Sequence, residues 1–546
     1  MRTGGEILID CLEAQGVDRV FCVPGESYLA VLDGLYGRNI EVINARQEGG
    51  AAMMAEADGK LTGRPGIAFV TRGPGATNAA AGVHVAKQDS TPMILFVGQI
   101  GRRMKGREAF QEVDYRQTFR DLAKWVEEID HADRIPEVLS HAFHVAMSGR
   151  PGPVVLALPE DMLKDRTEAA PGPRVAVASP APAAAEVARF AEMFAAAERP
   201  FLLLGGSRWD EAARDAARAF AERHDLPASV TFRRQGLFDH EHPNYGGELG
   251  IGPNPKLKKR IEESDLLILV GGRLSEMPSQ GFSLLKMPAP QMPLVHVHPG
   301  AEEIGRIYAP ALGVNAAPGA FFEAVAGLPA RKKTGAAAEA HEAYLAWSGQ
   351  PPATPGAAEM GPIMSHLRAV APEAVLTNGA GNYATWGHRF WRFRDLRQQL
   401  APTSGSMGYG LPAAVAAKAR MPEKEVLCFA GDGCFQMTGQ EFGALAQYGL
   451  NVIVLLVDNS SYGTIRMHQE RDYPGRVSAT KLVNPDFAAL ARAYGGHGET
   501  VGKTEDFPEA FARARESGKP AIIHILTDVE AITPTTTLTA LRERAR

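Results

Sequence analysis

The sequence has few of the features that mark secreted, membrane and nucleic-acid-binding proteins. It contains only four cysteines in 546 residues and no Cys-x-x-Cys pair, which argues against a disulfide framework or a zinc site. Its net charge of −5 provides no basic surface for nucleic acid or an acidic membrane. Because its apolar runs are no longer than a strand and its N-terminus has none, we expect no membrane span and no signal peptide. These absences favour a cytoplasmic protein.

The chain also lacks the glycine-rich signatures of common nucleotide-binding folds. No Gly-x-Gly-x-x-Gly turn and no Walker lysine loop stands at a strand–helix junction. An enzyme that depends on NAD(P) or a nucleoside triphosphate is therefore a weak interpretation.

Alternating helix and strand patterns predict three α/β domains, because the length exceeds what one hydrophobic core supports. Two segments with little periodicity, 170–184 and 331–358, are expected to be linkers. Each domain is expected to be a doubly wound parallel sheet with helices on both faces. The predicted units are residues 1–168, 185–330 and 358–530, followed by a tail, 531–546, with a basic, solvated helix. An active-site lid is a less favoured role for this tail.

The strongest chemical pattern lies in the third predicted domain. The sequence Gly-Asp-Gly-Cys at 431–434 follows an expected strand, and a helical pattern and a second apolar run lead to Asn459. Parallel strands end at the same edge of an open sheet, so the Asp432 carboxylate and the Asn459 amide oxygen can converge on a hard cation such as Mg²⁺. The backbone N–H groups of Gly433 and Cys434, at a helix N-terminus, suit a phosphate. The pattern predicts an anchor for a diphosphate and its cation.

This stretch resembles the diphosphate motif of thiamin-diphosphate (ThDP) enzymes, in which Gly-Asp-Gly is followed at a fixed distance by Asn-Asn. Asp458-Asn459 stands in that place here, which keeps the second position, the family's metal ligand. The resemblance implies ThDP and Mg²⁺ as cofactors, with Asp432, Asn459 and the carbonyl of Ser461 as metal ligands. It also implies a cofactor-binding set made up of Gly25, Glu48, Asn78, Gly381, Asn382, Tyr383, Gly405, Met407, Gly431, Asp432, Gly433, Cys434, Asn459, Ser461, Tyr462, Gly463 and Thr464.

Glu48 is the candidate for the carboxylic acid that activates ThDP. It follows an expected strand and opens a helix of small residues, where another molecule can approach closely. Residues 46–51, Arg-Gln-Glu-Gly-Gly-Ala, resemble the family's Arg-His-Glu-Gln-Gly-Ala, whose glutamate binds the pyrimidine that removes the thiazolium proton. Without this match, a glutamate stabilised by a helix dipole is the simpler interpretation.

Two further loops match the ThDP family. The segment 404–412 resembles the one that bends the cofactor, with a carbonyl at Gly405 for the exocyclic amine and a bulky wedge at Met407. Taken alone, such a methionine more often packs in a core. The loop 378–383 resembles the second phosphate contact, in which residues 381 and 382 donate to the diphosphate and Tyr383 flanks it; a plain turn is the alternative.

Three stretches resemble the large subunit of acetohydroxyacid (acetolactate) synthase, namely 73–78, 98–104 and 109–112. They imply that Phe110 and Gln111 line the thiazolium pocket as catalytic residues. The alternative is that Phe110 is a loop aromatic that packs on its own domain. The implied reaction decarboxylates pyruvate and joins the two-carbon unit to a second 2-keto acid. Other ThDP-dependent 2-keto acid decarboxylases or lyases, benzoylformate-type decarboxylases, pyruvate oxidases and a non-catalytic relative stay open as alternatives.

Two departures from the synthase pattern leave the acceptor substrate open. Glu26 replaces a glycine near the expected substrate entrance, and His468 stands where synthases carry a tryptophan. The middle domain resembles the flavin-binding domain of synthases, but the segments 247–252 and 271–276 match it only in part, so binding of FAD also stays open.

In the resembled family, the activating glutamate and the metal site come from different subunits. The resemblance therefore implies a homodimer or a dimer of dimers, with active sites at the dimer interface between Glu48 of one copy and Asp432 of another. A small regulatory subunit is a further partner that the family allows.

Overall fold

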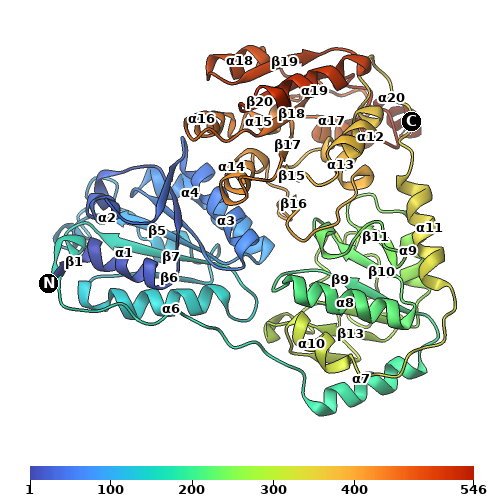
Figure 1. Cartoon of the computed structure of the whole chain (residues 1–546), viewed down its shortest axis with the longest axis horizontal. Helices are drawn as coiled ribbons and strands as arrows, with labels where there is room; N and C mark the ends of the chain where they lie inside the picture. Colours follow the sequence, from blue (N-terminus) through green and yellow to red (C-terminus); the bar gives the residue numbers. More distant parts are fainter. Residues whose placement is uncertain (546) are drawn as a thin grey trace.

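The computed structural model describes residues 1–545 and contains three parallel six-stranded sheets and a short two-stranded one. Figure 1 shows the three α/β units as separate lobes, with the first at the left, the second at the lower right and the third at the top. Helices cover the sheets of all three units. This arrangement confirms the predicted fold class of three doubly wound parallel-sheet domains.

The first unit has the strand order β3-β2-β4-β5-β7-β6. Its inner strands β5 and β7 are buried along their whole length, which explains why they read as continuous apolar runs. The strands are β1 (Arg2–Thr3), β2 (Arg19–Cys22), β3 (Glu41–Asn44), β4 (Gly66–Val70), β5 (Met93–Gln99), β6 (Trp125–Glu128), β7 (Pro153–Pro159) and β8 (Arg166–Thr167). The helices are α1 (Gly4–Ala14), α2 (Leu29–Leu35), α3 (Glu48–Thr62), α4 (Pro74–Asp89), α5 (Tyr115–Thr118) and α6 (Ile135–Met147).

The second unit has the strand order β11-β10-β9-β12-β13-β14. Its strands are β9 (Pro200–Leu204), β10 (Ala228–Thr231), β11 (Tyr245–Leu249), β12 (Leu266–Val270), β13 (Leu294–Val297) and β14 (Leu312–Val314). Its helices are α7 (Ala184–Ala196), α8 (Glu211–His224), α9 (Pro255–Glu262) and α10 (Pro318–Val325).

A helix, α11 (Ala336–Ser348), corrects the predicted linker at 331–358. It buries Ala337, Ala340 and Tyr344 and packs beside β11. Its apolar side chains are mostly alanines, so the segment looked like an aperiodic linker. The aromatic side chain of Tyr344 supplies the burial that stabilises this helix.

The third unit has the strand order β16-β15-β17-β18-β20-β19. Its strands are β15 (Val375–Asn378), β16 (Gln399–Leu400), β17 (Val426–Gly431), β18 (Ile453–Asp458), β19 (His497–Val501) and β20 (Ala521–Leu526). Its helices are α12 (Met360–Val370), α13 (Ala384–Phe390), α14 (Gly410–Arg420), α15 (Asp432–Phe435), α16 (Phe442–Gln447), α17 (Gly463–Asp472), α18 (Phe487–Ala493) and α19 (Phe507–Glu516). Because β17 and β18 are neighbours, the residues that follow them emerge side by side at one edge.

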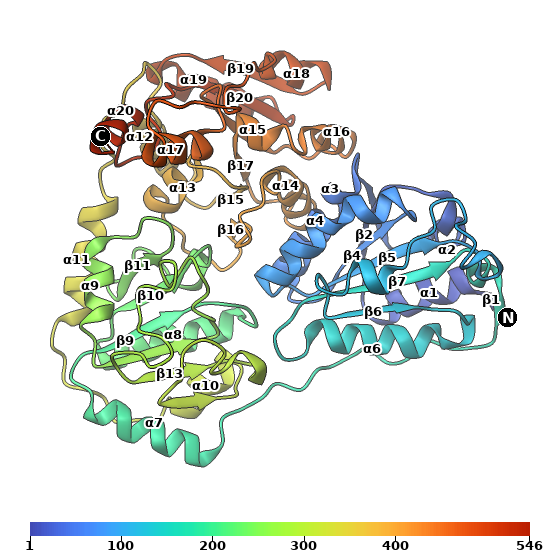
Figure 2. The same cartoon turned by 180° about the vertical axis from the view of Figure 1, so that it is seen from behind.

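Helices α3 and α14 join the first unit to the third (Figure 2). Both helices are rich in alanine and glycine, so their axes can approach closely. A single buried apolar cluster continues from one unit into the other across this contact. At one end, Arg420 of α14 donates to Asp58 of α3 at 2.8 and 3.0 Å. The first and third units of one chain therefore share part of their core.

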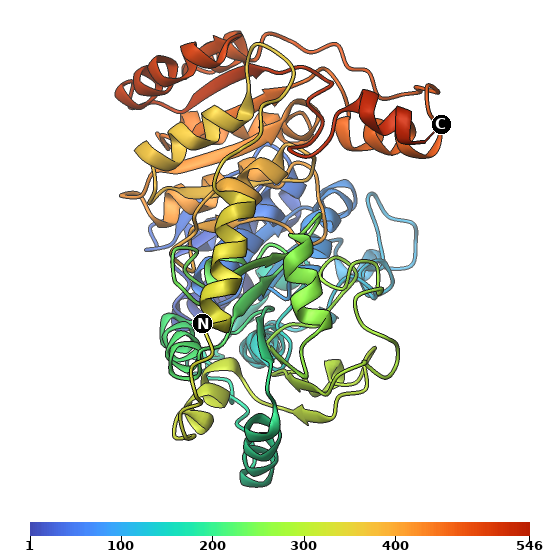
Figure 3. The ribbon, with the colours of Figure 1, turned by 90° about the vertical axis from the view of Figure 1, so that its right-hand side faces the viewer.

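The tail ends in a docked helix, α20 (Leu538–Arg544), which corrects the expected solvated helix. It packs beside α17, as Figure 3 shows near the C-terminus. Leu538 is buried, and Arg542 donates two hydrogen bonds of 2.9 Å to the buried Glu470 of α17. Among residues 1–545, no helix combines the length and the apolar character needed to cross a membrane.

Candidate functional site

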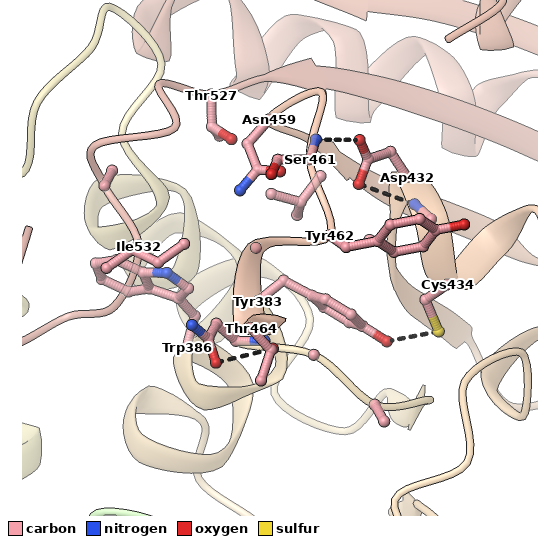
Figure 4. Close-up of a pocket in the computed structure, with 18 of the residues that line it drawn as sticks. Tyr383, Trp386, Asp432, Cys434, Asn459, Ser461, Tyr462, Thr464, Thr527 and Ile532 are labelled. Atoms are coloured by element: carbon pink, nitrogen blue, oxygen red, sulfur yellow. Dashed lines mark hydrogen bonds between the residues drawn. The ribbon is translucent and has the colours of Figure 1, made fainter. Parts of the chain in front are cut away.

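A cavity of about 240 Å³ opens at the carboxyl edge of the third sheet (Figure 4). The loops after β15, β17, β18 and β20 line it, and all of its lining residues lie between Thr354 and Ile532. Every site residue that the sequence predicts in the third unit belongs to this lining: Gly381, Asn382, Tyr383, Gly405, Met407, Gly431, Asp432, Gly433, Cys434, Asn459, Ser461, Tyr462, Gly463 and Thr464. Trp386, Thr527 and Ile532 also line it and were not predicted.

Asp432 lies at the end of β17 and opens α15. One carboxylate oxygen accepts the N–H of Gly433 at 2.8 Å, and the other accepts the N–H of Ser461 at 3.2 Å and the amide of Asn484 at 2.8 Å. Burial raises the pKa of Asp432 to about 6. Its hydrogen bonds come from neutral N–H groups rather than from a cationic side chain, so a bound cation would stabilise the carboxylate.

Asp458, which replaces the first asparagine of the family motif, does not line the cavity. Its carboxylate accepts the N–H of Ser460 at 2.7 Å and the amide of Asn484 at 2.8 Å, and lies 2.8 Å from Nε2 of His524. Burial alone would raise the pKa of Asp458, but the hydrogen bonds from His524, Ser460 and Asn484 outweigh it and lower this pKa to about 2. The substitution is therefore accommodated outside the cavity lining, by hydrogen bonds to its own neighbours.

Asn484 joins the two aspartates and was missed by the sequence analysis. Its amide donates both to Asp432 and to Asp458, at 2.8 Å in each case. It lies in a loop before α18 and belongs to no motif, so no local signal identified it.

The loops that would face a diphosphate are connected to one another. The Thr464 hydroxyl donates to the Asn382 side chain and accepts the Asn382 N–H, both at 3.0 Å. The Tyr383 hydroxyl donates to Sγ of Cys434 at 3.1 Å. Burial raises the pKa of Tyr383 well above its usual value, so the phenol stays neutral. These contacts tie the loops after β15, β17 and β18 into one wall.

The donor atoms around the cavity fit a divalent cation and a diphosphate. Asp432, Asn459 and Ser461 all line the cavity. The oxygen types that these residues carry, a carboxylate, a side-chain amide and a backbone carbonyl, suit Mg²⁺. Gly405 has φ of +69° and no heavy atom within 4 Å of the position of a Cβ, so its backbone faces open space at the rim. Met407 lines the same cavity and is half-buried.

The residues predicted in the first unit form a separate group at the carboxyl edge of its sheet. Glu48 opens α3, where Gln47 caps the helix by accepting the N–H of Gly50 at 3.0 Å. The Glu48 carboxylate accepts the side-chain amide of Asn78 at 3.0 Å. Gly25, at the turn after β2, approaches the side chain of Thr71 so closely that a Cβ would lie 2.5 Å from it.

Phe110 and Gln111 lie on a loop beside this group. The Phe110 side chain is 74% exposed, and its carbonyl accepts from Arg72 at 3.3 Å. Arg72 also pairs with Glu26 at 2.8 Å and with Glu160 at 3.1 Å. None of these residues lines the cavity of the third unit, so within one chain the structure does not bring Glu48 and Asp432 into one cavity.

The departure at His468 lies on α17, one residue after Met467, whose sulfur accepts from the Asn382 side chain at 3.4 Å. His468 is half-buried, and its Nδ1 is buried with no hydrogen-bond partner among residues 1–545. It is therefore not the plain surface histidine that a lone helical position suggests.

The sequence matches three family models along its length. Residues 2–118 match "Thiamine pyrophosphate enzyme, N-terminal TPP binding domain", residues 187–325 the central domain, and residues 379–525 the C-terminal TPP binding domain.

Curated relatives share this organisation over almost the whole chain. The acetolactate synthase large subunit of Parasynechococcus marenigrum is 32% identical, over 96% of this chain and 87% of its own length. That of Corynebacterium glutamicum is 31% identical, over 97% and 87%. The acetolactate synthase isozyme 1 large subunit of Escherichia coli is 31% identical, over 97% and 94%.

Proposed function

Because this chain belongs to the thiamin-diphosphate-dependent enzymes of the acetolactate synthase type, we propose that it decarboxylates pyruvate and joins the two-carbon unit to a second 2-keto acid. The observation that carries the proposal is the cavity in which Asp432, Asn459 and Ser461 meet the phosphate-facing loops. Mg²⁺ as the metal and the identity of the acceptor are part of the proposal.

In this proposal the third unit holds the diphosphate end of the cofactor. Asp432, Asn459 and the Ser461 carbonyl hold Mg²⁺, and backbone N–H groups of the loops after β15 and β17 bind the phosphates. Tyr462, Gly463 and Thr464 complete the wall, and Gly405 and Met407 face the two rings. When bound, ThDP supplies the carbanion that attacks the keto acid and accepts the electrons of decarboxylation.

We further propose that Glu48 serves the cofactor of a second copy of the chain. The cavity that holds Asp432 is lined only by residues between 354 and 532, while Glu48 lies in another group on the first sheet. Apolar side chains are exposed on both units, with Phe110 at 74% and Val483 at 94%. A dimer that joins the two groups would cover such surfaces and place Gly25, Asn78, Phe110 and Gln111 near the rings.

The proposal is limited to a homodimer with ThDP and Mg²⁺ and does not include FAD. Two side chains in the segments that only partly match the flavin pattern already have partners within the chain. Glu248 is buried and accepts the N–H of Arg233 at 2.8 Å, and burial raises its pKa to about 7. Arg273 donates to the Gln88 carbonyl at 2.8 Å. An absorption spectrum of the purified protein tests this: flavin bands would contradict it. The relatives are named as large subunits, which implies a further subunit for those proteins. The proposal for this chain does not include one.

A product assay with pyruvate tests the reaction. Acetolactate, scored as acetoin after treatment with acid, supports ligation, whereas acetaldehyde or acetate as the product indicates a decarboxylase or an oxidase. The assay is run with ThDP and Mg²⁺, with and without a second 2-keto acid.

One observation favours a second candidate, a ThDP enzyme that uses an uncharged acceptor. Glu26 and Glu160 share the single guanidinium of Arg72, and the Glu26 side chain is 67% exposed. The surplus negative charge at this edge of the first sheet disfavours a second anionic substrate. Aldehydes assayed beside 2-keto acids as acceptors distinguish the two candidates.

A further inference from the structure

Three charged side chains form a buried network in the first unit. Glu56 and Lys60 lie one turn apart on α3, and Asp89 ends α4. Nζ of Lys60 lies 3.1 Å from Glu56 and also donates to Asp89. The side chains of Glu56 and Asp89 are fully buried, and that of Lys60 is 9% exposed. Burying such charges is costly unless each finds several partners. Thr91 of the first unit donates to Glu56 at 2.6 Å, and further partners of Glu56 and Asp89 belong to the third unit.

The network holds both ends of the loop 401–409, which carries Gly405 and Met407. At the first end, Asp89 accepts the N–H of Thr403 at 2.7 Å and also its hydroxyl, and Lys60 donates to the Ala401 carbonyl at 3.3 Å. At the other end, the Tyr409 hydroxyl donates to Glu56 at 2.6 Å. Between these ends, Gly408 is held within the third unit, because its N–H donates to Sγ of Cys434 at 3.2 Å and its carbonyl accepts the Thr438 hydroxyl at 2.6 Å. Gly405 and Met407 line the cofactor cavity, and the network of Glu56, Lys60 and Asp89 does not contact them directly.

Electrostatics favour the ionised form of Asp89. Burial alone would raise the pKa of Asp89, but Lys60, Arg234 and the hydrogen bond from Thr403 outweigh it and lower this pKa. Arg234, from the second unit, also donates to the Asp89 carbonyl at 2.6 Å. All three units therefore meet at the residue that holds Thr403.

The first and third units also meet through contacts that do not involve the loop. The apolar cluster between α3 and α14 and the pair Asp58–Arg420 already join the first unit to the third. The network adds contacts to both ends of the loop 401–409, which carries Met407.

We propose that Glu56, Lys60 and Asp89 are positioning residues, which fix the ends of the loop 401–409 and thereby set where Gly405 and Met407 meet the ThDP rings. The inference rests on the proposed place of Met407 beside the cofactor. Helix α3 then serves two active sites, because Glu48 in its first turn faces the partner's cofactor, while Glu56 and Lys60 order the loop for the chain's own cofactor.

The affinity for ThDP tests this proposal in the full-length chain after removal of cofactor with a chelator. Trp386 lines the cavity, so a titration with ThDP at constant Mg²⁺ can be followed by tryptophan fluorescence. Asp89→Asn and Thr403→Val are each expected to raise the half-saturating ThDP concentration about tenfold, the factor for one charge-assisted hydrogen bond. Thr403→Ser keeps the hydroxyl and is expected to stay within about twofold of the wild type.

Asp58→Asn is the matched control, because it removes a buried carboxylate from α3 that pairs with the third unit but not with the loop. It is expected to lower the melting temperature as Asp89→Asn does while ThDP affinity stays unchanged. Tyr409→Phe, which removes only the hydroxyl at Glu56, gives a second measurement if Asp89→Asn does not fold, with an expected loss of about threefold.

Two results would overturn the proposal that Glu56, Lys60 and Asp89 position the loop. Wild-type ThDP affinity in Thr403→Val and Tyr409→Phe would show that the loop needs no anchors. If Asp58→Asn lowers the ThDP affinity as much as Asp89→Asn does, the effect comes from the packing of the first unit against the third and not from the loop contacts. A wild-type chain that binds no ThDP would instead refute the proposed function, and the positioning role with it.

Discussion

Replacement of Glu48 by glutamine separates its chemical role from its structural one. The carboxylate has a single hydrogen-bond donor among residues 1–545, the Asn78 amide at 3.0 Å, and a glutamine carbonyl can accept the same bond. The charge at the first turn of α3 interacts favourably with the helix dipole, so its loss costs about 0.3–1 kcal/mol of stability. The fold and the affinity for ThDP should therefore change little.

Catalysis should respond far more strongly to the same change. A positioned general acid or base typically contributes about 10²–10⁴-fold to the rate, and glutamine cannot exchange a proton with the pyrimidine. We expect kcat for pyruvate to fall by about that factor, while the half-saturating ThDP concentration stays within about threefold.

Glu6→Gln provides the matched control for Glu48→Gln. Glu6 is also a first-turn glutamate, in the capping box of α1, and lies outside both groups of candidate residues. The Glu6→Gln substitution should lower the free energy of unfolding by a similar amount and leave kcat unchanged. If Glu48→Gln keeps the wild-type turnover, Glu48 is not the activating acid. If ThDP binding and turnover fall together, its role is in holding the cofactor.

The remaining predictions concern the assembly and the tail. Mixing Glu48→Gln chains with Asp432→Asn chains should restore activity to about a quarter of the wild-type level. Half of the randomly formed dimers would contain both variants, and each of these would hold one intact site of two. If no activity is recovered, both residues belong to the site of one chain. The pKa of Glu470 is lowered from 4.5 to about 2, chiefly by the hydrogen bonds from Arg542, so this contact stabilises the fold above about pH 4.5 and is lost as the pH falls toward 2. Arg542→Ala should therefore lower the melting temperature at pH 7, with a difference from the wild type that shrinks across that range; a constant difference would exclude the linkage.

The sequence allowed the local elements and the third-unit cavity to be predicted, because the relevant signals are short in range. Continuous apolar runs such as 266–270 require strands buried on both faces, and the structure has β12 there. Neighbouring parallel strands bring the residues that follow them to one edge, which is why Asp432 and Asn459 could be placed together before the fold was known.

Long-range pairing was decided only by the tertiary structure. Asn484 reaches both Asp432 and Asp458, and Asp89 holds Thr403 across 314 positions of sequence. From the sequence, an asparagine in a loop indicates a turn and an aspartate at a helix end indicates a cap. Hydrogen-bond partners so far apart in the sequence leave no periodic pattern that would indicate otherwise. The motifs identify the chemistry that this chain can support, while packing of the three units determines which charged side chains are buried together and which loop they hold in place.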